Sequence, residues 1–195
     1  MRRSIVPGLK PQGPGCNDKS LRERVVNVVT ALPFLALSRS ELSQDTSQER
    51  KMYGLSMLAV GMAATAYHCS SGPVRKAFRR ADYWSISLAS NQLARAAHPG
   101  KMPLSLTALS LAATPFQPTA VTTVNMAAAE IGLARKAKQQ PGVRKAYRHH
   151  VLAGATGLAC FGLEDIAIQH DFHFVHSMWH CLAFYGLAKA SSVLS

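Results

Sequence analysis

The 195-residue chain is strongly basic, with 22 Lys and Arg against 10 Asp and Glu, a balance that ordinarily indicates an acidic partner such as nucleic acid or anionic lipid. Its basic residues form short clusters between long uncharged runs and make no continuous stripe, which argues against a nucleic-acid partner. Hydrophobic residues make up 48% of the chain and charged residues only 16%, a pattern typical of a multi-pass membrane protein. The uncharged runs are rich in Ala, Ser, Thr and Gly, so a soluble all-α protein remains the alternative.

The first third of the chain predicts a flexible head and two membrane spans. Residues 1–24 are basic and contain Pro and Gly, which is typical of a flexible segment. The apolar run at residues 25–37 is broken by Pro33 and is short for a full span, which needs about 20 residues. A polar segment separates this run from residues 53–70, a second span that is dense in Met, Ala and Leu and ends near His68.

The rest of the chain predicts five more helices. A basic loop at residues 75–80 precedes the third helix, which opens at Asp82. Pro115 and Pro118 separate the fourth helix from the fifth, and a long basic loop at residues 135–148 follows the fifth. We therefore predict an all-α integral membrane bundle of seven transmembrane helices over residues 25–195. The predicted spans are residues 25–37, 53–70, 82–97, 102–116, 120–134, 150–168 and 174–194.

Histidines gather where the seventh span begins. On a helix, the four-residue spacing of His176 and His180 places both imidazoles on one face, where they can share one metal ion. If every span crosses the membrane once, the end of the second span, the start of the third and the start of the seventh lie on the same side. This arrangement places His68 and Asp82 at the level of the histidine pair.

These four residues have the chemistry of a catalytic zinc site. Three neutral imidazoles, those of His68, His176 and His180, would leave a fourth position open for water. Metal-bound water ionises near neutral pH, and Asp82 could orient that water, take its proton or hold a ligand histidine. Each residue also has a purely structural interpretation, with His68 as an interfacial side chain beside Tyr67 and Asp82 as a helix N-cap.

Three short segments also carry a family resemblance: AYH at residues 66–68, ADYWSI at 81–86 and HSMWH at 176–180. Their order and positions resemble the signature of the seven-helix superfamily of alkaline ceramidases, adiponectin-type receptors, GPI-remodelling lipid hydrolases and myomaker-like proteins. The HSxWH form is most similar to the myomaker-like branch. The resemblance implies a zinc ion on the three histidines, assisted by Asp82, and hydrolysis of an amide or ester of a membrane lipid.

One position departs from the family pattern. The family usually has a Ser one helical turn before the first histidine, where its hydroxyl can stabilise the reacting carbonyl or its oxyanion. Here that position is Ala64, and Thr65 is the nearest hydroxyl that could take over the catalytic role. The departure keeps a second hypothesis open, in which the chain is a non-catalytic receptor or membrane-remodelling member of the superfamily with a structural zinc ion.

Four further residues lie close to the predicted site in sequence. Glu164 and Asp165 end the sixth span on the same side as the histidines, so either could hold a ligand histidine through its ring N–H. His170 and His173 precede His176 into the connecting loop, where we expect them to be exposed, with auxiliary metal contact as the alternative.

Overall fold

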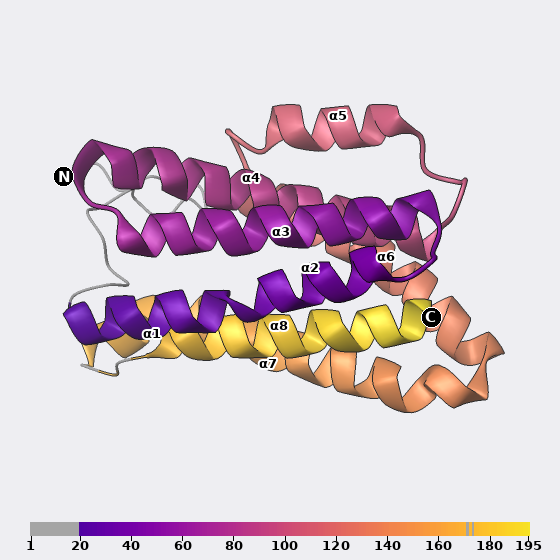
Figure 1. Cartoon of the computed structure of the whole chain (residues 1–195). Helices are drawn as coiled ribbons and strands as arrows, with labels where there is room; N and C mark the ends of the chain where they lie inside the picture. Colours follow the sequence, from indigo (N-terminus) through magenta and orange to yellow (C-terminus); the bar gives the residue numbers. More distant parts are fainter. Residues whose placement is uncertain (1–19, 171, 173) are drawn as a thin grey trace.

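The computed structural model describes residues 20–170, 172 and 174–195, which form a bundle of α-helices (Figure 1). Strands are absent from this described part of the chain, so the predicted all-α class is confirmed. In chain order the helices are α1 (Leu21–Ala31), α2 (Pro33–Ser43), α3 (Gln48–Cys69), α4 (Gly72–Ala97), α5 (Leu104–Ala113), α6 (Pro118–Gln139), α7 (Arg144–Gln169) and α8 (Val175–Leu194).

The first helix begins inside the segment that was predicted to be flexible. The Ser20 side chain accepts a hydrogen bond from the Glu23 backbone N–H, and the Glu23 carboxylate accepts one from the Ser20 backbone N–H at 2.8 Å. This capping box satisfies two of the free amide donors at the helix start. Helix α1 therefore begins at Leu21. Residues 1–19 of the predicted basic segment, residues 1–24, lie outside the described residues.

Helices α1 and α2 form one kinked stretch. Pro33 occupies the first turn of α2, where its missing N–H removes no helical hydrogen bond, and Leu32 has helical backbone angles. The prediction of a short run at residues 25–37 is therefore wrong. The joined stretch, Leu21–Ser43, has 23 residues and a mean hydropathy of 1.3, and among the described residues it alone is long and apolar enough to cross a membrane. A core helix of a soluble protein can meet the same criteria, so the seven-span arrangement stays a prediction.

Two segments that were predicted as basic loops are largely helical. Residues 75–80 belong to the first turns of α4, which begins at Gly72. Residues 135–139 end α6 and residues 144–148 begin α7, with only Gln140 and the short turn η1 (Pro141–Val143) between them. Lys and Arg are good helix formers, so a cluster of positive charge does not by itself end a helix.

The predicted fourth span is a short surface helix. Helix α5 has 10 residues and buries none of them, and it lies along the outside of the bundle (Figure 1). At about 1.5 Å of rise per residue it is about 15 Å long, half the thickness of a bilayer core.

Helix α3 runs antiparallel to α4, and α7 runs antiparallel to α8, whereas α4 and α6 run parallel to each other and α1 runs parallel to α8 (Figure 1). Helix α3 packs on α4 and α7 packs on α8, while α1 and α2 contact both α3 and α8. The core between them contains large side chains such as Phe34, Tyr53, Met57, Leu93 and Leu133. This arrangement brings the C-terminal end of α3 and the N-terminal end of α8 to the same end of the bundle.

Candidate metal centre

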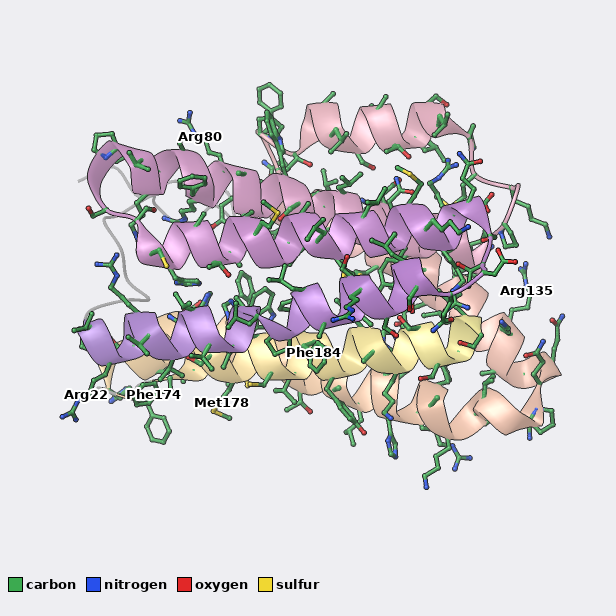
Figure 2. All side chains as sticks on the ribbon, in the orientation of Figure 1. Arg22, Arg80, Arg135, Phe174, Met178 and Phe184 are labelled. Carbon is green, nitrogen blue, oxygen red and sulfur yellow. The ribbon has the colours of Figure 1, made fainter. Side chains whose placement is uncertain are left out.

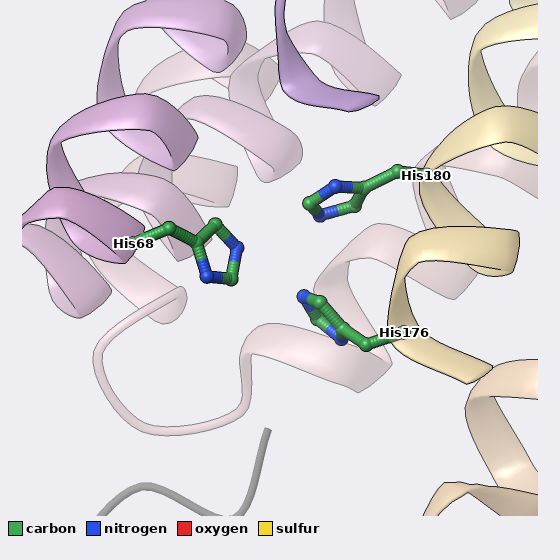
Figure 3. Close-up of side chains that lie close together, drawn as sticks. All are labelled: His68, His176 and His180. Carbon is green, nitrogen blue, oxygen red and sulfur yellow. The ribbon is translucent and has the colours of Figure 1, made fainter. Parts of the chain in front are cut away.

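Three histidines from two helices meet at one end of the bundle (Figure 3). His68 lies in the last turn of α3, and His176 and His180 lie in the first two turns of α8. One ligand nitrogen from each ring lies within 4.8 Å of the others, and the ring centroids are 4.6–5.3 Å apart. His68 and His180 are buried and His176 is half-buried. The structure thus brings together the three predicted metal ligands.

The fit to a metal ion rests on the donor set and its spacing. Three imidazole nitrogens are ligands that zinc prefers, and three protein ligands leave room for a fourth. The i, i+4 pair on α8 faces α3 because residues four apart share one side of a helix. Phe174, at φ 66° and ψ 7°, turns the chain into α8 from the left-handed region, which non-glycine residues rarely adopt.

A buried carboxylate holds one of the ligand rings. Oε1 of Glu164, near the end of α7, lies 3.2 Å from Nδ1 of His176, and the Glu164 side chain is only 3% exposed. The contact is an ion pair and not a hydrogen bond, and the negative charge beside Nδ1 favours the tautomer of neutral His176 that carries its proton there. Nε2 then keeps its lone pair for a metal ion, the arrangement in which a carboxylate orients a zinc-bound histidine. Glu164 was one of the two acids predicted for this role; the other, Asp165, has a side chain outside the described residues.

The second ligand on α8 is held from α1. The Thr30 hydroxyl lies 3.1 Å from Nδ1 of His180 and donates its proton to the Val26 carbonyl at 2.9 Å. When the hydroxyl donates to that carbonyl, it accepts a hydrogen bond from Nδ1 of His180, and this tautomer leaves Nε2 free to bind. Sequence reasoning missed Thr30, whose one signal is that it is a lone hydroxyl in an apolar run.

Two arginines secure the helix end that carries His68. Arg24, from α1, donates through Nε to the His68 carbonyl at 3.0 Å and through Nη2 to the Ser70 carbonyl at 2.8 Å. Arg75 donates to the Tyr67 carbonyl at 3.3 Å and stacks over the Tyr67 ring at 4.2 Å. These contacts satisfy carbonyls that a helix leaves free at its C-terminus, and they place positive charge where the helix dipole favours it. The His68 side chain itself is buried, and its ring packs beside the Tyr67 ring.

The two predicted catalytic residues have buried polar atoms without partners. Asp82 lies well inside α4 and not at its start, so its interpretation as an N-cap is wrong. Its Oδ1 is buried and has no hydrogen-bond partner among the described residues, and its charge interacts with His176. The Thr65 hydroxyl, three residues before His68, is likewise buried and without a partner there. Ala64 is buried at 3% exposure. Unpaired buried polar atoms are rare and call for an explanation.

The other histidines take no part in this cluster. His170 is exposed, as predicted, and His173 lies outside the described residues. Toward the opposite end of α7, His150 is buried and pairs through Nε2 with Glu130, while its Nδ1 lies 2.8 Å from the Gly186 carbonyl. This second His–Glu pair joins α6, α7 and α8.

Comparison of the chain with protein-family models, with curated proteins and with solved structures finds no match.

Proposed function

We propose that the chain is a multi-pass membrane protein of the seven-helix ceramidase and adiponectin-receptor type, which binds one zinc ion and hydrolyses an amide or ester bond of a membrane lipid. The observation that carries this proposal is the convergence of His68, His176 and His180, together with a buried Asp82 oxygen that has no hydrogen-bond partner among the described residues.

The outer surface of the helices supports a lipid environment. Large hydrophobic side chains are exposed on the outer sides of most helices, among them Leu55 at 46%, Val124 at 68% and Leu158 at 66%. Figure 2 shows Phe174 and Met178 pointing away from the bundle. Exposed apolar side chains of this kind are what a membrane protein presents to lipid tails.

The interior supports the same proposal because it is unusually polar. Asn125 donates to the Ser87 carbonyl at 3.2 Å, and its Oδ1 accepts from Ser110 at 3.1 Å and from Asn91 at 3.4 Å. These contacts join α4, α5 and α6. Small and polar residues that bond across helices are typical of helix interfaces in lipid, where packing and hydrogen bonds replace the hydrophobic effect.

Each residue of the site has a role in such a hydrolysis. A zinc ion supplies Lewis acidity and lowers the pKa of a water molecule at its open position. Glu164 and Thr30 fix the ring orientations, so the ligands are preorganised. Asp82 takes the proton from the attacking water, because its unpaired oxygen is free to accept one. The Thr65 hydroxyl donates a hydrogen bond to the carbonyl oxygen of the substrate, where negative charge develops.

A second function deserves a test because of Ala64. Without the usual Ser, the site lacks one oxyanion donor, whose loss costs about 10²- to 10³-fold in rate in a well-studied hydrolase. In this alternative the zinc ion only joins α3 to α8, and the chain acts as a receptor or membrane-remodelling protein.

Two measurements on purified full-length protein separate these functions. Elemental analysis should give about one zinc per chain, and a panel of ceramides, phospholipids and acyl esters should reveal the substrate class. Asp82→Asn should abolish hydrolysis and retain zinc, while Asp45→Asn, at a fully exposed acid, should change neither. Ala64→Ser should raise the rate and Thr65→Val should lower it. Zinc-loaded protein that cleaves nothing on the panel, even as Ala64→Ser, would favour the structural function.

A further inference from the structure

A cavity lies at the end of the bundle opposite the histidines. It has a volume of about 430 Å³ and is lined by the α2–α3 connection, the start of α3 and the ends of α4, α6 and α8. Arg50, which lines it, and His68 lie on the same helix, 18 residues apart, so about 27 Å separates the cavity from the histidine cluster. The cavity shares no residue with the proposed zinc site.

Two cationic side chains line the cavity from different helices. Arg50 comes from α3 and Lys136 from α6. The Glu41 carboxylate accepts hydrogen bonds from Nε of Arg50 at 3.1 Å and from Nη2 at 2.9 Å. The N–H groups of Nη1 take no part in these bonds with Glu41. The Lys136 ammonium group donates a hydrogen bond to the Leu194 carbonyl at 2.7 Å and has two further N–H donors.

The two cations are close enough to disfavour each other. Burial lowers the pKa of Lys136, and the positive charge of Arg50 lowers it further. An anion between the two side chains would relieve this repulsion and restore the solvation that Lys136 loses through burial.

Neutral donors reach the same cavity. The Thr46 hydroxyl oxygen is buried and has no hydrogen-bond partner in the described part of the chain, and Thr46 lines the cavity. Ser47, beside it, is the N-cap of α3, a 22-residue helix whose first amide groups carry partial positive charge. Of the nearby acids, Glu41 is occupied by Arg50 and Asp45 has a fully exposed side chain. Glu49, in the first turn of α3, is not among the residues that line the cavity.

We propose that this cavity binds a phosphate group, with Lys136, Arg50 and Thr46 as donors and the N-terminus of α3 as a further source of positive potential. A phosphate offers several acceptor oxygens in different directions, which suits donors that arrive from separate helices. The cavity volume of about 430 Å³ leaves room for the chemical group to which the phosphate is attached. The same chemistry is presented by free phosphate and by the headgroup of a phospholipid at the bilayer surface.

The test compares two probes on the full-length protein purified in detergent. Inorganic phosphate is titrated in one arm and dihexanoyl phosphatidylglycerol in the other, with chloride at matched ionic strength, and binding is followed by calorimetry and by the melting temperature. Lys136→Gln removes the charge and keeps the length of the side chain. Lys138→Gln, at an exposed lysine on the same helix, is the matched control. Thr46→Val is the second variant, because Arg50 cannot be removed without leaving Glu41 buried and unpaired.

At least one probe should bind and raise the melting temperature. Lys136→Gln should weaken binding about tenfold to a hundredfold, the loss expected for one hydrogen bond from a charged donor. Thr46→Val should weaken it less, and Lys138→Gln should leave it unchanged. Binding of both probes identifies free phosphate as a sufficient ligand, and binding of the lipid alone identifies a headgroup site. Failure of both probes to bind, or equal binding by Lys136→Gln and the unmodified protein, would overturn the proposal. Zinc content and hydrolysis do not enter either measurement, so this outcome is independent of the proposed zinc chemistry.

Discussion

Glu164→Gln tests whether the carboxylate beside His176 sets the zinc affinity. The substitution preserves the side-chain volume and an acceptor oxygen but removes the negative charge that faces Nδ1 of His176 at 3.2 Å. The contact is an ion pair and not a hydrogen bond. A polar contact with a charged group exceeds a neutral one by about 1–1.5 kcal/mol, so the substitution should raise the zinc dissociation constant about five- to thirteenfold.

The Glu164 carboxylate is almost fully buried, so water screens its charge little, and we expect the upper end of this range. Glu164→Ala should raise the dissociation constant further, toward the hundredfold limit typical of residues that orient a metal ligand, because it also removes the acceptor. Thr30→Val should have a smaller effect, since the bond between Thr30 and His180 is neutral.

The assay is competition for zinc against a fluorescent chelator on the purified full-length protein. Glu130→Gln is the matched control, because Glu130 forms the other His–Glu pair of the bundle, with His150. Glu164 and His150 lie on one helix, 14 residues and about 21 Å apart. An unchanged zinc affinity in Glu164→Gln, or an equal loss in Glu130→Gln, would refute the assigned role. Melting temperatures measured without zinc show whether any loss comes from a damaged fold.

Three further predictions concern the bundle itself. Alkaline carbonate extraction should leave the protein in the membrane pellet. Release of the protein into the supernatant would favour the interpretation as a soluble all-α protein. A double variant, His176→Ala with His180→Ala, should lose its zinc and melt at a lower temperature, because the metal joins helices far apart in sequence; full zinc occupancy by elemental analysis would contradict the ligand assignment. Gly132→Ala should lower the stability of the protein by about 1–3 kcal/mol, because the new Cβ would lie 2.6 Å from the Ala97 carbonyl oxygen. Gly154→Ala meets open space and should stabilise its helix by up to about 1 kcal/mol. Thermal unfolding of both variants measures these changes.

The histidine cluster could be predicted because residue spacing and helix order are enough to locate it. The spacing of His176 and His180 fixes their common face on a helix, and counting helices places His68 at the same end. The predicted common end of the histidines is right although the first helix and several helix ends were predicted wrongly. The reason is that α3, α4 and α8 exist as predicted and still alternate in direction.

The contacts around the cluster could not be predicted in the same way. Thr30 and Arg24 reach the site because α1 packs on both α3 and α8, and nothing in the local sequence of α1 indicates those neighbours. The helix ends were misplaced for a different reason: clusters of Lys and Arg were interpreted as loops, although these residues favour helices. Asp82 was consequently placed at the start of α4 when it lies well inside that helix.

The position of α1 against both ligand-bearing helices has a consequence for how the protein is made. Thr30 and His180 are 150 residues apart, and the cluster needs one helix from near the start of the chain and another from its end. A ribosome completes α1, α3 and α4 long before it reaches α8, so a nascent chain carries His68 and Asp82 without the other two ligands. The hydrogen bonds from Arg24 to the end of α3 join two helices that are both made before α8. A metal ion held by all three histidines would require α8 to be in place against α3.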